Sequence, residues 1–467
     1  MDYRVEQDTL GEMKVPVDKL WAAQTQRSKE NFKIGIEEMP EEVLKGFAVL
    51  KKSAALANQE LGHLNADKAE AIVQASNEIL DGKLYEHFPL KVWQTGSGTQ
   101  SHMNINEVIA NRGNQWLGKS GSEERLHPND DVNLSQSSNC NFPTAMYIAG
   151  VTAIEDQVFP ALTAMKETLL KKSEEYQDLV KVGRTHLQDA VPLTLGQEIS
   201  AWHRMMEKTE DMIQESNVKM EELAFAGTAV GTGLNTYKAF PEIAVKKISS
   251  FTGKRFVPAS NKFHALTSYD EVVYCHGALK ALASDLMKLA NDIRWLASGP
   301  RSGIGEITIT ANEPGSSMMP GKVNPTQCEA LTMVATQVIG NDVTVGLAAS
   351  QGNFQVNVFK PVIAYNFLQS ARLLADGMIS FNKNCLKGLK PNEEVIKKNL
   401  DQSLMLVTVL NPHIGYENAA KIAKTAHDQG LTLKEAAVQT GLLTEEVFDE
   451  IVNPINMTHP KSLERTL

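Results

Sequence analysis

The stretch LKALASDLMKLANDIRWL at 279–296 has the most regular apolar pattern in the chain. Its leucine and isoleucine residues recur at alternating intervals of three and four positions, at Leu279, Leu282, Leu286, Leu289, Ile293 and Leu296. This spacing is that of a heptad seam, in which one stripe of a long helix packs against other helices. The stretch therefore predicts a long helix, and the buried stripe requires other helices of similar length beside it.

Two further apolar stripes predict those neighbouring helices. One consists of Ile148, Val151, Ile154, Val158, Leu162, Met165 and Leu169, and the other begins with Leu195, Ile199, Trp202 and Met206. The first stripe continues through Pro160, where we expect a kink or a restart of the helix. No comparable β pattern is evident, so the sequence predicts an all-α fold built on a central bundle of long helices.

Changes in composition along the chain predict three domains. The region before about residue 125 is broken by prolines into shorter helical patterns, such as the one at 43–61. After residue 389, a turn at Lys390-Pro391-Asn392 precedes shorter polar helices, two of which are opened by Thr432 and Thr444. We expect an N-terminal helical domain at 1–136, a central helical bundle at 137–390 and a small C-terminal helical domain at 391–467.

Composition and charge narrow the class of protein. Of the 467 residues, 42% are hydrophobic and 22% charged, which is typical of a globular chain. The formal charge of −10 gives no electrostatic reason to bind nucleic acid or an anionic membrane. The four cysteines are too widely spaced to indicate a zinc site or a disulfide scaffold. With an acidic N-terminus unlike a leader and no apolar run of roughly 20 residues, we expect a cytoplasmic protein.

Five strings that adjoin the apolar stripes are dense in hydroxyls, amides and a few charges. They are TGSGTQSHMNIN at 95–106, HPNDDVNLSQSSNCN at 127–141, GRTHLQDA at 183–190, GTAVGTGLN at 227–235 and EPGSSMMPGKVNPTQCEA at 313–330. Each string alone is compatible with a loop that caps a helix, because Ser, Thr, Asn and Asp satisfy free N–H groups at helix starts. The occurrence of five such strings in one chain favours a binding site.

The string at 313–330 combines a flexible loop with the start of a helix. Asn324 fits the cap position, Pro325 the first helical position and Gln327 the third. The preceding segment supplies serine hydroxyls and the cation of Lys322 beside the positive end of the helix dipole. Such a loop suits a carboxylate or a phosphate.

The same strings do not fit nucleotide or metal sites. Val323 stands where a P-loop needs Ser or Thr, and Ser101 stands where the dinucleotide motif needs its third glycine. His127 is followed by Asn and Asp, but no second imidazole lies at ligand spacing. His186 is the best candidate for a proton carrier, because the unperturbed pKa of histidine is about 6.5. A single histidine is also often structural.

These residues carry a family resemblance. The string GSSMMPGKVNPTQCEA resembles the signature of the fumarase/aspartase superfamily of lyases. The other four strings are similar to the remaining blocks of that superfamily, in the expected order and over nearly the whole chain. Within the superfamily the chain most resembles class II fumarase, because His186 stands where aspartases carry Gln and because NPTQCEA is similar to the fumarase version of that segment.

The resemblance implies a fold, a reaction and an assembly. It implies a three-domain lyase fold whose central bundle forms a tetrameric core, with each active site shared between three chains. The reaction would be the reversible, cofactor-free and metal-free hydration of fumarate to L-malate, by anti addition of water through an aci-carboxylate intermediate. The alternatives are an aspartate ammonia-lyase, another fumarate-releasing lyase of the superfamily, or a non-catalytic helical scaffold.

The resemblance also implies a role for each matching residue. Ser316 would be the catalytic base, Lys322 and Asn324 would stabilise the anionic intermediate, and His186 with Glu329 would handle the proton of water. Ser317 would donate a hydrogen bond to the substrate. Six further residues would form the substrate-carboxylate shell: Ser97, Thr99, Ser137, Ser138, Asn139 and Thr185. A second anion site would consist of His127, Asn129 and Asp130.

The chain departs from the family pattern at three positions near these blocks. Cys140 stands where the pattern Ser-Ser-Asn-Asp has its carboxylate, His102 stands where Asn is usual, and Gln355 replaces a common Glu. None of the three is a residue to which the resemblance gives a catalytic role. We therefore expect an active enzyme whose affinity or pH profile differs from that of its relatives.

Overall fold

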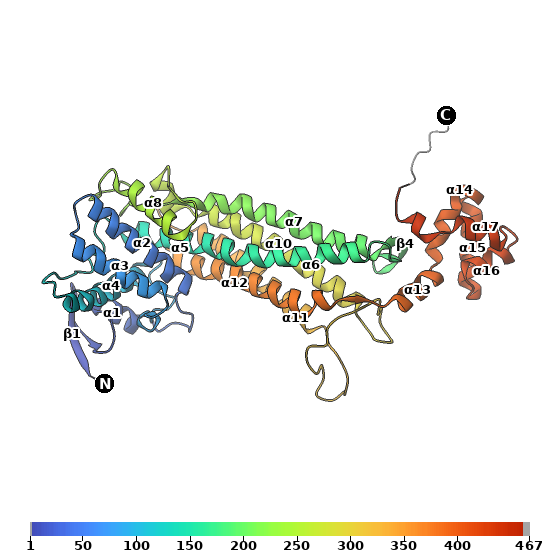
Figure 1. Ribbon diagram of the computed structural model, residues 1–467, viewed down its shortest axis with the longest axis horizontal. Coiled ribbons are helices and arrows are strands. Elements are labelled where there is room, and N and C mark those ends of the chain that lie inside the picture. Colours follow the sequence, from blue (N-terminus) through green and yellow to red (C-terminus); the bar gives the residue numbers. More distant parts are fainter. Residues whose placement is uncertain (1, 461–467) are drawn as a thin grey trace. The chain divides into compact units, whose positions relative to one another are not determined.

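The computed structural model describes residues 2–460 and consists mainly of helices, joined by a few short strands (Figure 1). The chain divides into two compact units, formed by residues 1–160, 209–283 and 334–375 and by residues 161–208, 284–333 and 376–467. Five helices contribute residues to both units: α6 (Phe159–Glu175), α7 (Leu195–Asn217), α10 (Asp270–Leu296), α11 (Thr326–Ala349) and α12 (Lys360–Asn384). The predicted three-domain division is not tested by this arrangement and stays a prediction.

The first unit is built around α2 (Glu41–Glu60), which packs against α3 (Ala66–Leu80), α5 (Ser138–Ala153) and α8 (Phe240–Thr252). Its other helices are α1 (Ala23–Asn31), α4 (Thr99–Ser120), α9 (Lys262–Thr267), the π-helical turn η2 (Ile154–Val158) and the 3₁₀ turns η1 (Tyr85–His87) and η3 (Val218–Glu221). Strands β1 (Tyr3–Asp8) and β2 (Gly11–Pro16) form an antiparallel hairpin, and β5 (Glu222–Leu223) pairs with β6 (Val257–Pro258) in parallel.

The second unit ends in a cluster of short helices. These are α13 (Glu393–Gln402), α14 (Asn411–Ile414), α15 (Tyr416–Gln429), α16 (Leu433–Gln439) and α17 (Glu445–Ile451), with the 3₁₀ turns η4 (Leu386–Gly388), η5 (Leu404–Leu410) and η6 (Pro454–Met457). The elements from η5 to α17 pack on an apolar core that includes Leu410, Ile422 and Phe448. Thr432 opens α16 with a capping box and Thr444 caps α17, so both predicted helix starts are confirmed.

The apolar stripes predicted from the sequence are confirmed as buried seams of long helices. Every residue of the 279–296 seam is buried in α10, and the residues of the other two stripes are buried in α5–α6 and α7. Polar contacts join these helices within each unit. Trp202 of α7 donates to Asp292 of α10 at 3.1 Å in the second unit, and His276 of α10 lies 2.8 Å from Ser370 of α12 in the first.

Pro160 falls at a restart of the helix, as predicted. A proline lacks the N–H of the helical ladder and crowds the carbonyl four residues before it. The wider turn η2 lies immediately before α6 and separates it from α5. The irregularity therefore precedes the proline, at the residues with which its ring would otherwise clash.

Three local predictions from the sequence are wrong. The string at 183–190 is mostly strand, because β3 (Val180–Thr185) and β4 (Gln188–Thr194) form an antiparallel hairpin. Most of the string at 95–106 is helix, since α4 begins at Thr99. The predicted turn at Lys390-Pro391 is the two-residue strand β8, which pairs with β7 (Ile307–Thr308). In these strings, small polar residues therefore lie at the ends of helices and strands and do not mark whole loops.

No helix among residues 2–460 is both long enough and apolar enough to cross a membrane.

Candidate active site

The predicted catalytic loop at 313–324 is a closed turn in the second unit. The backbone N–H of Gly315 donates to the carbonyl of Lys322 at 2.9 Å, which brings the two ends of the turn together. Within it, the Ser316 hydroxyl oxygen accepts hydrogen bonds from the backbone N–H groups of Met318 and Met319 at 3.2 and 2.9 Å. Ser317 and Lys322 lie exposed on the same turn.

The loop leads directly into α11, but Asn324 does not cap that helix as predicted. The Asn324 side chain donates to the Gly315 carbonyl at 2.6 Å, while the carbonyl of Pro325 accepts the first helical bond, from Glu329 at 3.1 Å. Gln327 accepts from Ser380 of α12 at 2.8 Å and takes no part in a capping box. The Asn324 side chain therefore closes the catalytic turn, and it is not available to cap α11.

Thr185 and His186 lie at the tip of the β3–β4 hairpin, where Thr185 pairs with Gln188 across a two-residue turn. Both turn residues have positive φ, 58° at His186 and 61° at Leu187. Positive φ at both positions is the requirement of the type I′ hairpin turn, which Asn-Gly adopts easily and His-Leu does only at a cost of about 1 kcal/mol or more per residue. The exposed imidazole of His186 therefore lies at the tip of a strained turn.

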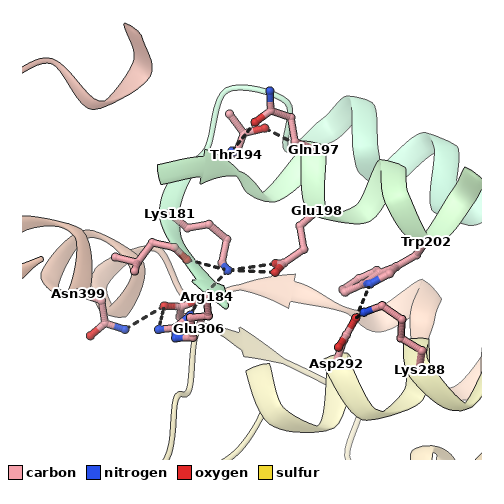
Figure 2. A network of polar contacts seen from close by, with 11 residues as sticks. Lys181, Arg184, Thr194, Gln197, Glu198, Trp202, Lys288, Asp292, Glu306 and Asn399 are labelled. Atoms are coloured by element: carbon pink, nitrogen blue, oxygen red, sulfur yellow. Dashed lines mark hydrogen bonds and ion pairs between the residues drawn. The ribbon is translucent and has the colours of Figure 1, made fainter. Parts of the chain in front are cut away.

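A buried carboxylate anchors this hairpin. Glu306 accepts two hydrogen bonds from Arg184 at 2.7 and 3.0 Å and one from Asn399 at 3.0 Å, and it lies 3.2 Å from Lys181 (Figure 2). Lys181 also pairs with Glu198 of α7 at 3.1 Å. Burial raises the pKa of Glu306, but the bonds from Arg184 and the charge of Lys181 outweigh it, so the pKa lies below its usual value.

The backbone of Glu306 fixes the segment that leads to the catalytic loop. The Glu306 carbonyl accepts from the backbone N–H of Asn392 at 2.8 Å, next to the pairing of β7 with β8. One residue therefore connects the hairpin that carries His186 with the chain that enters the Ser316 turn. Sequence reasoning missed it, because nothing in the string GIGEIT at 303–308 distinguishes a buried glutamate from an exposed one.

Glu329 is paired with an arginine within this chain, and its predicted role beside His186 stays a prediction. In the part of the chain that the structure describes, its carboxylate accepts from Arg294 of α10 at 3.2 Å, and no hydrogen bond or ion pair joins it to His186. Nor does one join His186 to the side chains of Ser316 or Lys322 in that part.

The predicted carboxylate shell of the first unit lies at two helix starts. Ser97 and Thr99 lie at the N-terminus of α4, with their hydroxyl oxygens 2.9 Å apart. Gly98 between them has a φ of 75°, and a Cβ there would collide with the ring of Phe142. Such helix starts carry free N–H groups and the positive end of a dipole, which suit a carboxylate.

The second of these helix starts is that of α5. Ser137 caps the helix by accepting from the backbone N–H of Asn139, and the Asn139 side chain donates to the carbonyl of Ala229 at 2.8 Å. Ser138 is the first helical residue, and its hydroxyl lies 2.8 Å from Nδ1 of His102. The predicted residues at these two helix starts lie in the first unit. The other predicted catalytic and substrate-binding residues lie in the second unit: Thr185, His186, Ser316, Ser317, Lys322, Asn324 and Glu329.

Of the three residues that depart from the family pattern, His102 and Cys140 are buried beside this helix start, whereas Gln355 is exposed. His102 lies 2.8 Å from Nζ of Lys51, and both side chains are fully buried. Burial, and then the charge of Lys51, lower the pKa of His102 well below its usual value, and burial likewise lowers the pKa of Lys51. Burial also raises the pKa of the Cys140 thiol. We therefore expect His102 and Cys140 to be neutral near pH 7.

Lys360 is a further buried amine that sequence reasoning missed. It is the first residue of α12, and its backbone N–H donates to the carbonyl of Gly96 at 3.1 Å. Its Nζ has no hydrogen-bond partner within residues 2–460. Burial lowers its pKa to about 8, and the nearby Cys140 opposes this shift. The only signal in the sequence is a lysine placed directly before Pro361 at a helix start.

The predicted second anion site is an exposed turn in the first unit. His127 lies 3.1 Å from the Asp130 carboxylate, and its ring nitrogen accepts from the backbone N–H of Asp130. Asn129 is exposed on the same turn. The turn is closed by its own hydrogen bonds, and the role of its residues stays a prediction.

One group of potential metal ligands lies outside the predicted strings. Donor atoms of His264, Asp270 and Glu271 lie within 4.8 Å of one another near the start of α10. His264 is 3.1 Å from Asp270, and Tyr147 donates to Glu271 at 3.0 Å. Exposed acidic groups of this kind are common without an ion, and these residues have no part in the chemistry proposed for the site.

The comparisons with known proteins show the family of the chain. A family model described as lyase matches residues 11–340, and one described as fumarase C C-terminus matches residues 406–459. Fumarate hydratase class II of Bacillus cereus is 71% identical over 461 residues, 99% of this chain and 100% of that protein. The enzyme of the same name from Bacillus anthracis is 70% identical with the same coverage.

The solved structures give the same result. The class II fumarase of Schistosoma mansoni has a TM-score of 0.95 and 42% identity, over 99% of this chain and 100% of that one. The family model and the solved structure thus show a lyase of the fumarase/aspartase superfamily. Within it, the chain belongs to the class II fumarases.

We expect Glu306→Ala to destabilise the second unit strongly. Removing the carboxylate leaves Arg184 without its acidic partner and Lys181 with Glu198 alone, and breaking a buried ion pair typically costs about 3–5 kcal/mol. Urea unfolding measures this as a fall in the free energy of unfolding. Glu450→Ala, which removes an exposed glutamate of α17, is the matched control and should change stability by less than about 0.5 kcal/mol. Equal losses in the two variants would contradict the anchoring role of Glu306.

We expect Lys360→Met to stabilise the protein at pH 7. The pKa of Lys360 is about 8 in the folded protein and 10.5 ordinarily. Folding with Lys360 charged therefore costs up to about 3 kcal/mol more than folding with it neutral. Between pH 8 and 10.5 the unfolded chain binds more protons than the folded one, so the stability of the wild type rises with pH in this window. The advantage of the variant should therefore be largest below pH 8 and vanish near pH 10.5.

Unfolding of the wild type and Lys360→Met in urea at pH 7 and pH 10 measures this difference. Lys238→Met removes an exposed lysine of the same unit and serves as the control. A difference between Lys360→Met and the wild type that stays constant with pH would show that Lys360 keeps its charge when buried.

Proposed function

We infer that the chain catalyses the reversible hydration of fumarate to L-malate, by anti addition of water through an aci-carboxylate intermediate. The observation that carries the mechanism is the pair of backbone N–H groups that donate to the Ser316 oxygen. An unactivated serine is a poor base near pH 7, because its alkoxide is too unstable. Two fixed donors stabilise that alkoxide at little cost in reorganisation.

In the direction of dehydration, Ser316 takes the proton from the methylene carbon of malate. The carboxylate next to that carbon becomes the doubly negative aci-carboxylate, which needs positive charge and hydrogen-bond donors nearby. Lys322 supplies the charge from the same turn. Asn324 holds the turn closed through Gly315, and this contact supports a positioning role in addition to the direct one predicted from the family.

The second proton transfer involves the hydroxyl that leaves as water. His186 is exposed on a strained turn, and we propose that it handles this proton with Glu329 as its partner. The carboxylates of the substrate would be held by Ser97, Thr99, Ser137, Ser138, Asn139, Thr185 and Ser317. His127, Asn129 and Asp130 would form the second anion site. No step assigned to these residues requires a metal ion or an organic cofactor.

We also propose that the chain assembles into a homotetramer with active sites shared between three chains. An exposed stripe on one face of α11, formed by Met333, Gly340, Val343 and Leu347, supports this proposal. The three apolar side chains are 60–67% exposed, although the opposite face of the helix is already buried. A helix that is apolar on both faces fits a buried place in an assembly. A cytoplasmic location stays a prediction.

We expect purified enzyme to form fumarate from L-malate, followed by the ultraviolet absorbance of fumarate. Ser316→Ala should lower kcat by about 10² or more, because general-base catalysis contributes at least that much. Ser302→Ala, an exposed serine before the loop, is the matched control and should keep full activity. No turnover of L-malate by the wild type would refute the proposed function, and turnover of L-aspartate would indicate an ammonia-lyase.

We expect sedimentation equilibrium to give about four times the mass of one chain. Val343→Glu places a charge on the exposed stripe of α11 and should dissociate the assembly and abolish activity together. Ile36→Glu, at an exposed isoleucine elsewhere, should do neither. An active wild-type protein with the mass of one chain would overturn both the tetramer and the shared site.

A further inference from the structure

A directional chain of hydrogen bonds ends at Ser138 in the first unit. It begins at Gln136, whose amide nitrogen donates to the carbonyls of Val132 and Leu134, both at 3.1 Å. Since the nitrogen is used in this way, the Gln136 Oε1 must be the atom that faces its other neighbours, Lys51 and Asn141. An amide oxygen can only accept, so the backbone around Gln136 sets the direction of the next two bonds.

Asn141 and Lys51 are therefore both donors. The Asn141 Nδ2 donates to Gln136 Oε1 at 2.7 Å, while its Oδ1 accepts from the Cys140 thiol at 3.4 Å. The Lys51 Nζ donates to the same Gln136 oxygen at 2.9 Å. The Asn141 nitrogen has a second hydrogen to give. Lys51 Nζ also donates to Asn133 Oδ1 at 3.3 Å, and both nitrogens face the same atom of His102.

This atom is Nε2 of His102, which lies 2.8 Å from Lys51 Nζ and 3.1 Å from Asn141 Nδ2. Two donors facing one ring nitrogen require that this nitrogen carries no hydrogen. The assignment does not depend on the charge of Lys51, because the Asn141 nitrogen can only donate. Burial keeps the imidazole neutral by lowering its pKa, so its single hydrogen lies on Nδ1.

The tautomer of His102 decides the direction of the last bond. Nδ1–H donates to the Ser138 oxygen at 2.8 Å, and no other hydrogen bond of that hydroxyl is formed among the residues that the structure describes. The Ser138 hydrogen is therefore free to point away from His102, at the start of α5. With the opposite tautomer, Ser138 would donate to His102 and present only lone pairs, which repel a carboxylate.

We propose that His102 is a positioning residue that makes the Ser138 hydroxyl a hydrogen-bond donor to a carboxylate of the substrate. The proposal rests on the proposed function, because it needs a carboxylate at Ser138. It also gives a role to a departure from the family pattern. Asn, the usual residue at this position, has one acceptor and one donor, and the Nδ1-protonated imidazole provides the same pair of functions.

A double-mutant cycle tests whether His102 acts through Ser138. His102→Leu and Ser138→Ala should each raise KM for fumarate and L-malate roughly tenfold, the effect of one lost hydrogen bond to a charged group, with a smaller change in kcat. The double variant should be no worse than Ser138→Ala alone, because the hydroxyl that His102 orients is already absent. His102→Asn should restore most of the affinity.

Additive effects in the cycle would overturn the proposal, since they would mean that His102 acts independently of Ser138. It would also be overturned by an unchanged KM in Ser138→Ala. If His102→Leu lowered the yield of active protein but left KM unchanged, the role of His102 would be purely structural. That result would also overturn the proposal.

Neutron diffraction of the deuterated wild-type enzyme tests the assignment without any variant. Deuterium on Nδ1 of His102 and none on Nε2 is the expected result, and deuterium on Nε2 would overturn the proposal. This readout is separate from the proposed function, which fails only if the wild type does not turn over L-malate. An inactive wild type with deuterium on Nδ1 would refute the function while leaving the hydrogen-bond direction in place.

Discussion

The arrangement of the second unit depends on one buried carboxylate, that of Glu306. A glutamate without exposed surface is stable only when its charge is fully paired, and Arg184, Lys181 and Asn399 provide that pairing from β3 and α13. The partners come from segments far apart in the sequence, so the carboxylate is satisfied only when all of them are in place. The strained tip at His186 and the chain that enters the Ser316 turn are thus fixed by a single residue.

In the first unit, side chains are positioned by the direction of their hydrogen bonds rather than by a buried ion pair. Its cluster of buried amines contains a thiol where the family pattern has a carboxylate, so Lys51 and Lys360 lack an acidic partner at position 140. Neutral amides are the acceptors for Lys51, whereas Lys360 Nζ has no hydrogen-bond partner within residues 2–460. An amide has distinct donor and acceptor ends, so the backbone carbonyls that orient Gln136 ultimately orient His102 as well. The absence of a counter-charge therefore makes hydrogen-bond direction the property that the site depends on.

The sequence predicted those features whose cause is local or periodic. The seam of α10 and the caps at Thr432 and Thr444 are visible because burial repeats with the helical period and because caps use few residue types. The β3–β4 hairpin was missed because His186 and Leu187 replace the usual Asn-Gly turn. Glu306 and Lys360 were missed because burial of a charged residue depends on distant partners. Asn324 was misread because its residue type fits both a cap and a turn closure.

The helix starts explain how an acidic chain can attract an acidic substrate. A net charge of −10 repels fumarate at long range, so affinity must come from short-range groups. Polar strings open α4 and α5, and the Ser316 turn lies immediately before α11, so each supplies free N–H groups beside hydroxyls or Lys322. N–H groups at helix starts bind carboxylates without taking or giving a proton. In the proposed mechanism, these fixed dipoles hold the dianion, and the two proton transfers are left to Ser316 and His186, the groups that can exchange a proton.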